Sequence, residues 1–260
     1  MKRMIYQVAV GSQSKLYEHC IQSVANYCNK YNMTHIVQRE PILKIRPDMS
    51  RTGRSKEAVE RLGYMPIYEK ENAFAYFKDY DQIAVIDADV YIRPGAPDFF
   101  KELDESHDFG GVIERDMPVT KEYHAKLINY SGMQYSTLPT FKNTQWGTEA
   151  APFMNMGVML MNKSFANYLE GQTPLQFISR DEFQPFVDGM GAWKWSTDQT
   201  LLNYWIPKVG MKVKNLDWKW NGLYGVNTKI KECHFVHFFL KDLLPQQGEN
   251  VEELMERIDG

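Results

Sequence analysis

Short apolar segments alternate with helical segments over the first third of the chain, and this order restricts the possible folds most strongly. Residues 4–10 are apolar and β-prone, a helical stretch follows at 15–31, and residues 35–38 can form a second strand. A helix is expected from about Pro66 to Phe77, and residues 81–86 form another short apolar strand. Strands separated by helical crossovers predict an α/β fold with a mostly parallel central sheet flanked by helices, whose ligand sites lie beyond the carboxyl ends of the strands.

The remainder of the chain continues this pattern after a polar interval. Residues 114–150 are irregular and rich in turn-forming residues, so we expect a lid or binding loop there. The elements expected beyond it are a buried strand at 153–160, helices near 164–170 and from 196–199 onward, a last strand at 231–239 and an amphipathic helix at 251–258. No repeat or linker interrupts this order, so one domain is expected over residues 1–260.

Composition disfavours several classes of protein. The formal charge is −3 and the isoelectric point is near 6.1, so the chain has no strong positive field that would attract nucleic acid. Three cysteines at unrelated spacings, Cys20, Cys28 and Cys233, fit neither a disulfide framework nor a structural zinc cluster. No apolar stretch approaches the ~20 residues that span a bilayer, and the amino terminus is better explained as a first strand than as a signal peptide. These features predict a cytoplasmic protein without an integral membrane segment.

Two aspartates directly follow the strand at 81–86, in the sequence IAVIDADVYI. If the chain stays extended, Asp87 and Asp89 point to one side and Ala88 points to the other. Two carboxylates at one place suit Mg²⁺ or Mn²⁺, which would bridge the phosphate oxygens of a nucleotide. The alternative is a pair of turn-forming aspartates with no ligand, because Asp is common in turns.

Four segments in a fixed order decide between these two explanations. They are IAVIDADVYI at 83–92, FMNMGVMLMN at 153–162, TDQTLLN at 197–203 and HFVHF at 234–238. With them the chain resembles the GT-A glycosyltransferases, and is most similar to glycosyltransferase family eight, which includes glycogenin and bacterial galactosyltransferases. The segments correspond to the metal-binding D-x-D, the N-x-G segment, the D-Q-x-x-L-N helix and the terminal metal-binding histidine strand of that family. The first strand lacks the family's common aspartate, and Lys241-Asp242 stands near the place of its K-P-W.

The resemblance implies a GT-A, Rossmann-like nucleotide-diphospho-sugar transferase fold. It implies metal-dependent transfer of a sugar from a nucleotide-diphosphate sugar, expected to be a UDP-sugar, to the hydroxyl of a carbohydrate or other acceptor, with retention of configuration. The nucleotide-sugar half would be about 1–113 and the acceptor and catalytic half about 114–260.

The resemblance also implies a Mn²⁺ or Mg²⁺ ion held by Asp87, Asp89 and His237. Strand alternation places His234 and His237 on opposite faces, so only one of them can face the metal. His234 is the second choice, and without the resemblance either histidine could be structural.

Four further residues are assigned to the nucleotide or its phosphates. Lys70 and Arg54 would pair with the diphosphate or hold Asp87 in place, with Lys70 preferred; the alternative for a basic residue in a loop is simple solvation. Val10 and Gly11, which follow the first strand, would contact the nucleotide.

Three polar residues are assigned to the donor sugar. Asn155, inside an apolar strand, either satisfies buried backbone groups or binds the sugar, and the resemblance favours the sugar. Asp198 and Gln199 begin a helix, where Asp is a common first-turn residue; the resemblance places them near the reacting carbon.

Aromatic residues beyond position 145 could pack against the C–H faces of an acceptor sugar, although most are expected in the core. They are Trp146, Trp193, Trp195, Trp205, Trp218, Trp220 and Tyr224.

Two other functions use similar features. A nucleotide-sugar pyrophosphorylase would carry a glycine-rich loop after the first strand, but VAVGSQSK supplies one glycine. A sugar- or nucleotide-binding module that had lost catalysis could lack a metal ligand, but both aspartates and the histidine are present.

Overall fold

The computed structural model describes residues 1–11, 14–55, 59, 63–135 and 153–259. The strands of this part are β1 (Arg3–Val8), β2 (Thr34–Gln38), β3 (Gln82–Ile86), β4 (Val90–Ile92), β5 (Phe109–Ile113), β6 (Met154–Asn162), β7 (Val213–Asn215), β8 (Gly222–Leu223) and β9 (Phe235–His237). The α-helices are α1 (Lys15–Tyr31), α3 (Lys121–Tyr135), α4 (Pro174–Ile178), α5 (Gln184–Asp188), α6 (Asp198–Lys208) and α7 (Val251–Asp259). The 3₁₀ helices are η1 (Pro66–Lys78), η2 (Phe99–Glu102), η3 (Glu114–Asp116), η5 (Lys163–Leu169), η6 (Gly191–Trp193), η7 (Trp218–Trp220), η8 (Ile230–Glu232), η9 (Lys241–Leu243) and η10 (Pro245–Gly248).

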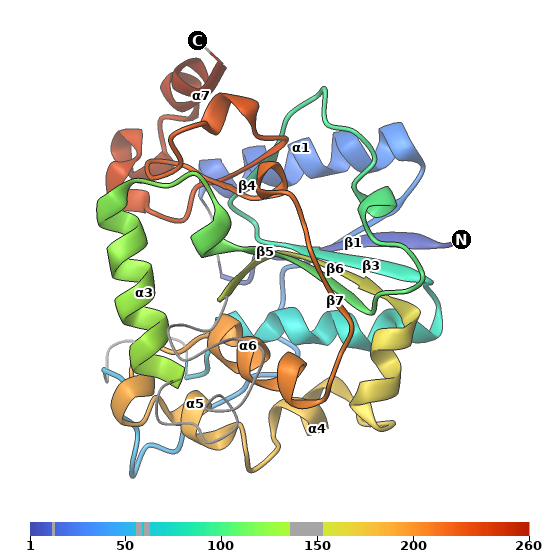
Figure 1. The fold of residues 1–260 in the computed structure, drawn as a ribbon, viewed down its shortest axis with the longest axis vertical. Coiled ribbons are helices and arrows are strands. Elements are labelled where there is room, and N and C mark those ends of the chain that lie inside the picture. Colours follow the sequence, from blue (N-terminus) through green and yellow to red (C-terminus); the bar gives the residue numbers. More distant parts are fainter. Residues whose placement is uncertain (12–13, 56–58, 60–62, 136–152, 260) are drawn as a thin grey trace.

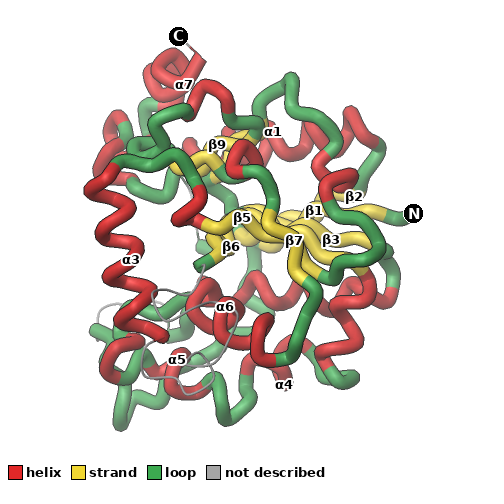
Figure 2. Tube along the Cα trace, in the orientation of Figure 1, coloured by secondary structure: helices red, strands yellow, loops and turns green. Residues whose placement is uncertain are grey.

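A central sheet lies between two layers of helices (Figures 1 and 2). In the described residues it has six strands in the order β2-β1-β3-β6-β5-β7. Helix α1 covers one face, whereas η1 and α6 cover the other. The α/β class with flanking helices, expected from the sequence, is confirmed.

Strand direction explains how the middle of the sheet brings distant segments together. β1 pairs in parallel with β2 and β3, and β5 pairs in parallel with β7, but β6 runs antiparallel to both of its neighbours. The sheet is therefore mostly parallel, as predicted. Because β6 is reversed, Ile86 at the carboxyl end of β3 lies opposite Val158 in the middle of β6, and the first residues of β6 continue past that end.

Apolar side chains fill both sides of the two middle strands. All five residues of β3 and all nine of β6 are buried. Alternate residues of β3 contribute to different clusters: Ile83 and Val85 pack on the η1 side, and Ala84 and Ile86 pack on the α1 side. This is the burial expected of a strand covered on both faces.

A second, smaller sheet receives the chain after β3. Among the residues described it has the order β4-β9-β8, and Val90 of β4 lies opposite His237 of β9. The segment Asp87-Ala88-Asp89 is therefore the turn between the two sheets, and the backbone N–H of Phe238 donates to the carbonyl of Asp89 (2.9 Å). Chain connectivity and strand pairing together bring His237 to the two aspartates.

The expectation of an irregular loop over 114–150 is wrong where the structure describes it. Residues 121–135 form α3, and residues 136–152 lie outside the described residues. The buried face of α3 includes Ser131 and Gln134 beside Leu127 and Tyr135. Polar residues on the buried face hid the apolar periodicity that usually reveals a helix.

Among the described helices, none combines the length and apolar character that crossing a membrane requires.

Candidate functional site

A cleft of about 1060 Å³ opens at the carboxyl ends of β1 and β3. Its walls also include the first residues of β6 and α6, the end of β9 and one side of α3. Eight residues predicted from the sequence line it: Val10, Lys70, Asp87, Asp89, Asn155, Asp198, Gln199 and His237. The fold therefore gathers most of the predicted site from segments far apart in the chain.

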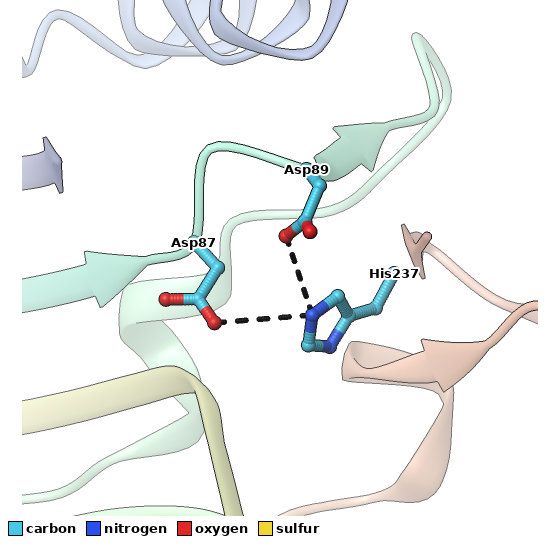
Figure 3. A group of neighbouring side chains, drawn as sticks. All are labelled: Asp87, Asp89 and His237. Atoms are coloured by element: carbon cyan, nitrogen blue, oxygen red, sulfur yellow. Dashed lines mark ion pairs between the residues drawn. The ribbon is translucent and has the colours of Figure 1, made fainter. Parts of the chain in front are cut away.

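Asp87, Asp89 and His237 point toward one another across the turn between the sheets (Figure 3). Nε2 of His237 lies 3.3 Å from Oδ1 of Asp89 and 3.8 Å from Oδ2 of Asp87. One ligand atom from each residue lies within 4.8 Å of the other two. Two carboxylate oxygens and an imidazole nitrogen at this spacing fit a divalent ion such as Mn²⁺ or Mg²⁺.

Burial and mutual charge set the protonation of this group. Burial acts to lower the pKa of His237, but the hydrogen bond and charge of Asp89 outweigh it and raise that pKa. Burial likewise acts to raise the pKa of Asp89, and the contact with His237 lowers it below its usual value. The carboxylate is thereby kept ionised, which is the form that binds a cation.

Lys70 joins the aspartate turn to the start of α6. Its Nζ lies 2.6 Å from Oδ2 of Asp198 and 2.9 Å from Oδ1 of Asp87, and it donates to the carbonyl of Met156 (3.1 Å). Burial acts to lower the pKa of Lys70, but the two carboxylates outweigh it and raise that pKa. A permanently charged ammonium therefore holds both carboxylates in place, which is one of the roles predicted for Lys70.

Glu114 is a buried carboxylate that the sequence reasoning missed. It follows β5 directly, lines the cleft, and accepts hydrogen bonds from Nδ2 of Asn155, Nε2 of Gln199 (3.1 Å) and the hydroxyl of Tyr123 (3.2 Å). It thus connects the predicted sugar-binding residues of β6 and α6. The available signal was a carboxylate directly after an apolar segment, as at Asp87, but two glycines in β5 weakened the strand pattern.

Arg54 and Gly11 are not among the residues that line the cleft. The guanidinium of Arg54 instead donates to the carbonyl oxygens of Phe186, Val187 and Ser196 at 2.8–2.9 Å. These bonds tie the loop before η1 to the segment that precedes α6. The structure thus gives Arg54 a backbone-binding role and does not bring it to Asp87.

His234 lies apart from the two aspartates. Its ring packs on Trp220, with centroids 4.7 Å apart. Of the two histidines in the last strand, the structure brings His237 to the aspartates, which is the predicted choice.

The aromatic side chains predicted for an acceptor do not line the cleft where they are described, and Trp146 lies outside the described residues. Trp205 and Trp220 are core residues. Other rings take this place: Tyr123, Tyr130, Phe153 and Phe239 line the cleft. Tyr17 and Lys241 are further lining residues outside the predicted set, and Nζ of Lys241 donates to the hydroxyl of Tyr17 (2.8 Å).

No protein-family model matches the chain, and no curated protein matches it by sequence. Solved structures do match over nearly its whole length. A glycosyltransferase involved in glycosylation of the major capsid of PBCV-1 matches 97% of this chain and 100% of its own, with 14% identity and a TM-score of 0.58. Mouse xyloside xylosyltransferase 1 matches with 12% identity, 94% and 100% coverage and a TM-score of 0.51.

The galactosyltransferase LgtC, solved with donor and acceptor sugar analogues, shows the same similarity. It has 12% identity, covers 97% of this chain and 94% of its own, and gives a TM-score of 0.52. At such low identity the shared property is the arrangement of the backbone. The chain therefore has the GT-A fold of nucleotide-sugar transferases.

Proposed function

We propose that this chain is a metal-dependent, retaining glycosyltransferase. It would move a sugar from a nucleotide-diphosphate sugar, with UDP as the expected nucleotide, to the hydroxyl of a carbohydrate or other acceptor. The observation that carries the proposal is the position of Asp87, Asp89 and His237 in the same cleft as Asp198 and Gln199. The GT-A fold supports it, and the similar LgtC structure holds donor and acceptor sugar analogues.

Asp87, Asp89 and His237 would hold Mn²⁺ or Mg²⁺, which supplies a Lewis acid that stabilises the negative charge on the departing diphosphate. The local charge favours a cation at this position. The site holds three buried or partly buried carboxylates: Asp87 and Asp198 pair with the ammonium group of Lys70, and Asp89 faces the imidazole of His237.

Asp198 and Gln199 would face the donor sugar in this proposal. The carboxylate of Asp198 is anchored by Lys70, and the amide of Gln199 is held by Glu114. Groups fixed in advance can stabilise positive charge that develops on the sugar as the leaving group departs, without reorganising during the reaction. Retention follows if acceptor and leaving phosphate occupy the same face of the sugar, which leaves Asp198 no role as the acceptor's base.

Within a single domain, one side of the cleft would bind the donor nucleotide and the other side would bind the acceptor. Residues from about 1–113 supply the ends of β1 and β3 for the nucleotide, and residues from about 114–260 supply α3, α6 and β9. The rings of Tyr123 and Tyr130 on α3 are suited to packing against a sugar acceptor.

A ligand panel tests this function. Thermal unfolding is measured with UDP-, GDP- and CDP-sugars, each with and without Mn²⁺, and turnover of any stabilising donor is followed by NMR. A donor at 100 times its Kd stabilises the folded state by about 2.7 kcal/mol. We expect a Mn²⁺-dependent shift with a UDP-sugar and loss of that shift in Asp89→Asn.

The other outcomes separate the competing functions. Donor binding without turnover against a panel of acceptors, or against water, would indicate a binding module. Formation of a nucleotide-sugar from a sugar phosphate and a nucleoside triphosphate would indicate a pyrophosphorylase. Absence of any Mn²⁺-dependent shift would contradict the proposed metal-dependent transferase.

A further inference from the structure

A fully buried asparagine lies behind the candidate metal ligand His237. The side chain of Asn221 has no exposed surface, and its Oδ1 lies 3.1 Å from Nδ1 of His237. The other ring nitrogen, Nε2, faces Asp87 and Asp89. The imidazole is therefore held between the carboxylates on one side and an amide on the other.

The orientation of the Asn221 amide is set by a backbone donor, the N–H of Gly157, which acts through Asn155. The N–H of Gly157 can only donate, and it donates to Oδ1 of Asn155 (2.9 Å). With that oxygen fixed, Nδ2 of Asn155 faces the carboxylate of Glu114. The neighbouring Asn221 must then present its Nδ2 to Oδ1 of Asn155, at 2.8 Å.

This order leaves one arrangement for the histidine. Once Nδ2 of Asn221 faces Asn155, its Oδ1 faces the ring, and an amide oxygen only accepts. Nδ1 of His237 must therefore carry a proton, so Nε2 is the nitrogen whose lone pair can bind a metal. A histidine that ligates through one nitrogen usually donates from the other to a fixed acceptor, which sets its tautomer and orientation.

The position of the His237 ring is fixed as well as its protonation. The ring of His237 lies directly against the backbone of β6, because a Cβ built on Gly157 would lie 2.3 Å from its Cε1 and 2.7 Å from its Nδ1. The same short segment of β6 thus supplies the space for the ring and, through Asn155, the hydrogen-bond direction.

We infer that Asn221, oriented by Asn155 and the Gly157 N–H, is a positioning residue that keeps Nδ1 of His237 protonated and turns Nε2 toward the metal. The inference rests on the metal site of the proposed function. It also gives Asn155 a role besides contact with the donor sugar, because the amides of Asn155 and Asn221 connect the backbone of β6 to His237 in the last strand. Asn221 itself is not among the residues that line the cleft.

Two variants separate this role from simple packing. Asn221→Leu has a similar size and removes the acceptor at Nδ1. Asn221→Asp keeps an acceptor there, in the carboxylate–histidine–metal arrangement found in many proteins. Asn227→Leu is the matched control, because Asn227 is also buried but accepts from the backbone N–H of Lys229 (2.8 Å).

The first readout is the dissociation constant of Mn²⁺, measured by electron paramagnetic resonance of free Mn²⁺ with the metal alone and with UDP. We expect Asn221→Leu to weaken Mn²⁺ binding on the order of 10- to 100-fold. Asn221→Asp keeps the acceptor at Nδ1 but loses the donor to Oδ1 of Asn155, so it should recover part of the affinity. Asn227→Leu should leave the affinity unchanged.

The second readout is made on the wild-type protein and does not depend on the Asn221 variants. The chain has six histidines, so long-range ¹H–¹⁵N spectra of the imidazoles are simple, and His237 is assigned by the signals lost in His237→Gln. We expect Nδ1 of His237 to be protonated before and after addition of Mg²⁺. An unprotonated Nδ1 in His237 would overturn the inference even if Asn221→Leu failed to fold.

The outcomes also distinguish this inference from the proposed function. Wild-type affinity in folded Asn221→Leu would overturn the role of Asn221 and leave the metal site intact. No Mn²⁺ binding to the wild type, alone or with UDP, would remove the metal site and this inference together. Weakened binding in Asn221→Leu, partly recovered in Asn221→Asp, supports the inference whether or not a sugar is transferred.

Discussion

Replacing Gly157 with alanine tests how closely β6 supports the candidate metal ligand His237. The added Cβ would lie 2.3 Å from Cε1 of the ring, and ordinary van der Waals contact begins at 3.4 Å. The ring must therefore move by about 1.1 Å or β6 must shift, since atoms this close repel steeply. Metal ligands hold their distances to within about 0.2 Å, so a shift of this size would take Nε2 out of reach of a metal held by Asp87 and Asp89.

The expected result is a loss of metal affinity with the fold retained. We expect Gly157→Ala to weaken Mn²⁺ binding by on the order of 100-fold, measured by calorimetry or by the paramagnetic resonance of free Mn²⁺. Overpacking in the core should cost about 1–3 kcal/mol of unfolding free energy, so circular dichroism and denaturant unfolding are recorded for the same samples.

Gly95→Ala is the control for this substitution. Gly95 is exposed, and a Cβ built on it meets nothing within 4 Å. It should bind Mn²⁺ as the wild type does. A folded Gly157→Ala protein with the wild-type Kd for Mn²⁺ would refute the argument that β6 positions His237.

Three further predictions concern the lysine bridge, the sugar site and a partly buried histidine. Lys70→Met should lower the unfolding free energy by about 3–5 kcal/mol in denaturant titrations, because it leaves the buried Asp198 and the partly buried Asp87 unpaired. Lys78→Met, at an exposed position of the same helix, should cost less than about 0.5 kcal/mol, and equal losses would contradict the bridge. Asp198→Asn should lower kcat by about 100-fold or more with little change in donor Kd, because the carboxylate acts chiefly in the transition state, and the wild-type product should keep the donor's anomeric configuration by NMR; an inverted product would rule out the retaining reaction. Burial lowers the pKa of His35 from 6.5 to about 4, so on acidification the unfolded state takes up a proton at a higher pH than the folded state does. The unfolding free energy should therefore be largest above pH 6.5 and fall by about 1–2 kcal/mol as the pH is lowered toward 4. His35→Asn should flatten this slope, and an unchanged slope would show that His35 is not its source.

Local sequence patterns predicted the elements that depend mainly on local burial. The apolar run before Asp87 and the long apolar run around Met159 became fully buried strands, and the helix at Lys15–Tyr31 was placed at its observed ends. The two aspartates of the candidate metal group were predicted from their place directly after such a strand, whereas His237 was chosen because of the resemblance to glycosyltransferase family eight.

The features that were not predicted depend on contacts between distant segments. Nothing local to β6 indicates that it runs antiparallel, yet that reversal is what places Asn155 beside the metal group. Arg54 lies in a basic loop whose pairing with the 186–196 segment arises only in the folded chain. Glu114 and Asn221 were missed for a related reason, because a buried polar residue reveals its role through its partners and not through its spacing.

The most direct test of this account is anomalous diffraction at the manganese absorption edge from crystals grown with Mn²⁺ and UDP. If Asp87, Asp89 and His237 bind the metal, one anomalous peak will lie at the cleft, within about 2.0–2.4 Å of carboxylate oxygens of Asp87 and Asp89 and of Nε2 of His237, with the diphosphate on its open side. A peak bound elsewhere, or UDP in the cleft with no manganese between it and these three residues, would contradict the account.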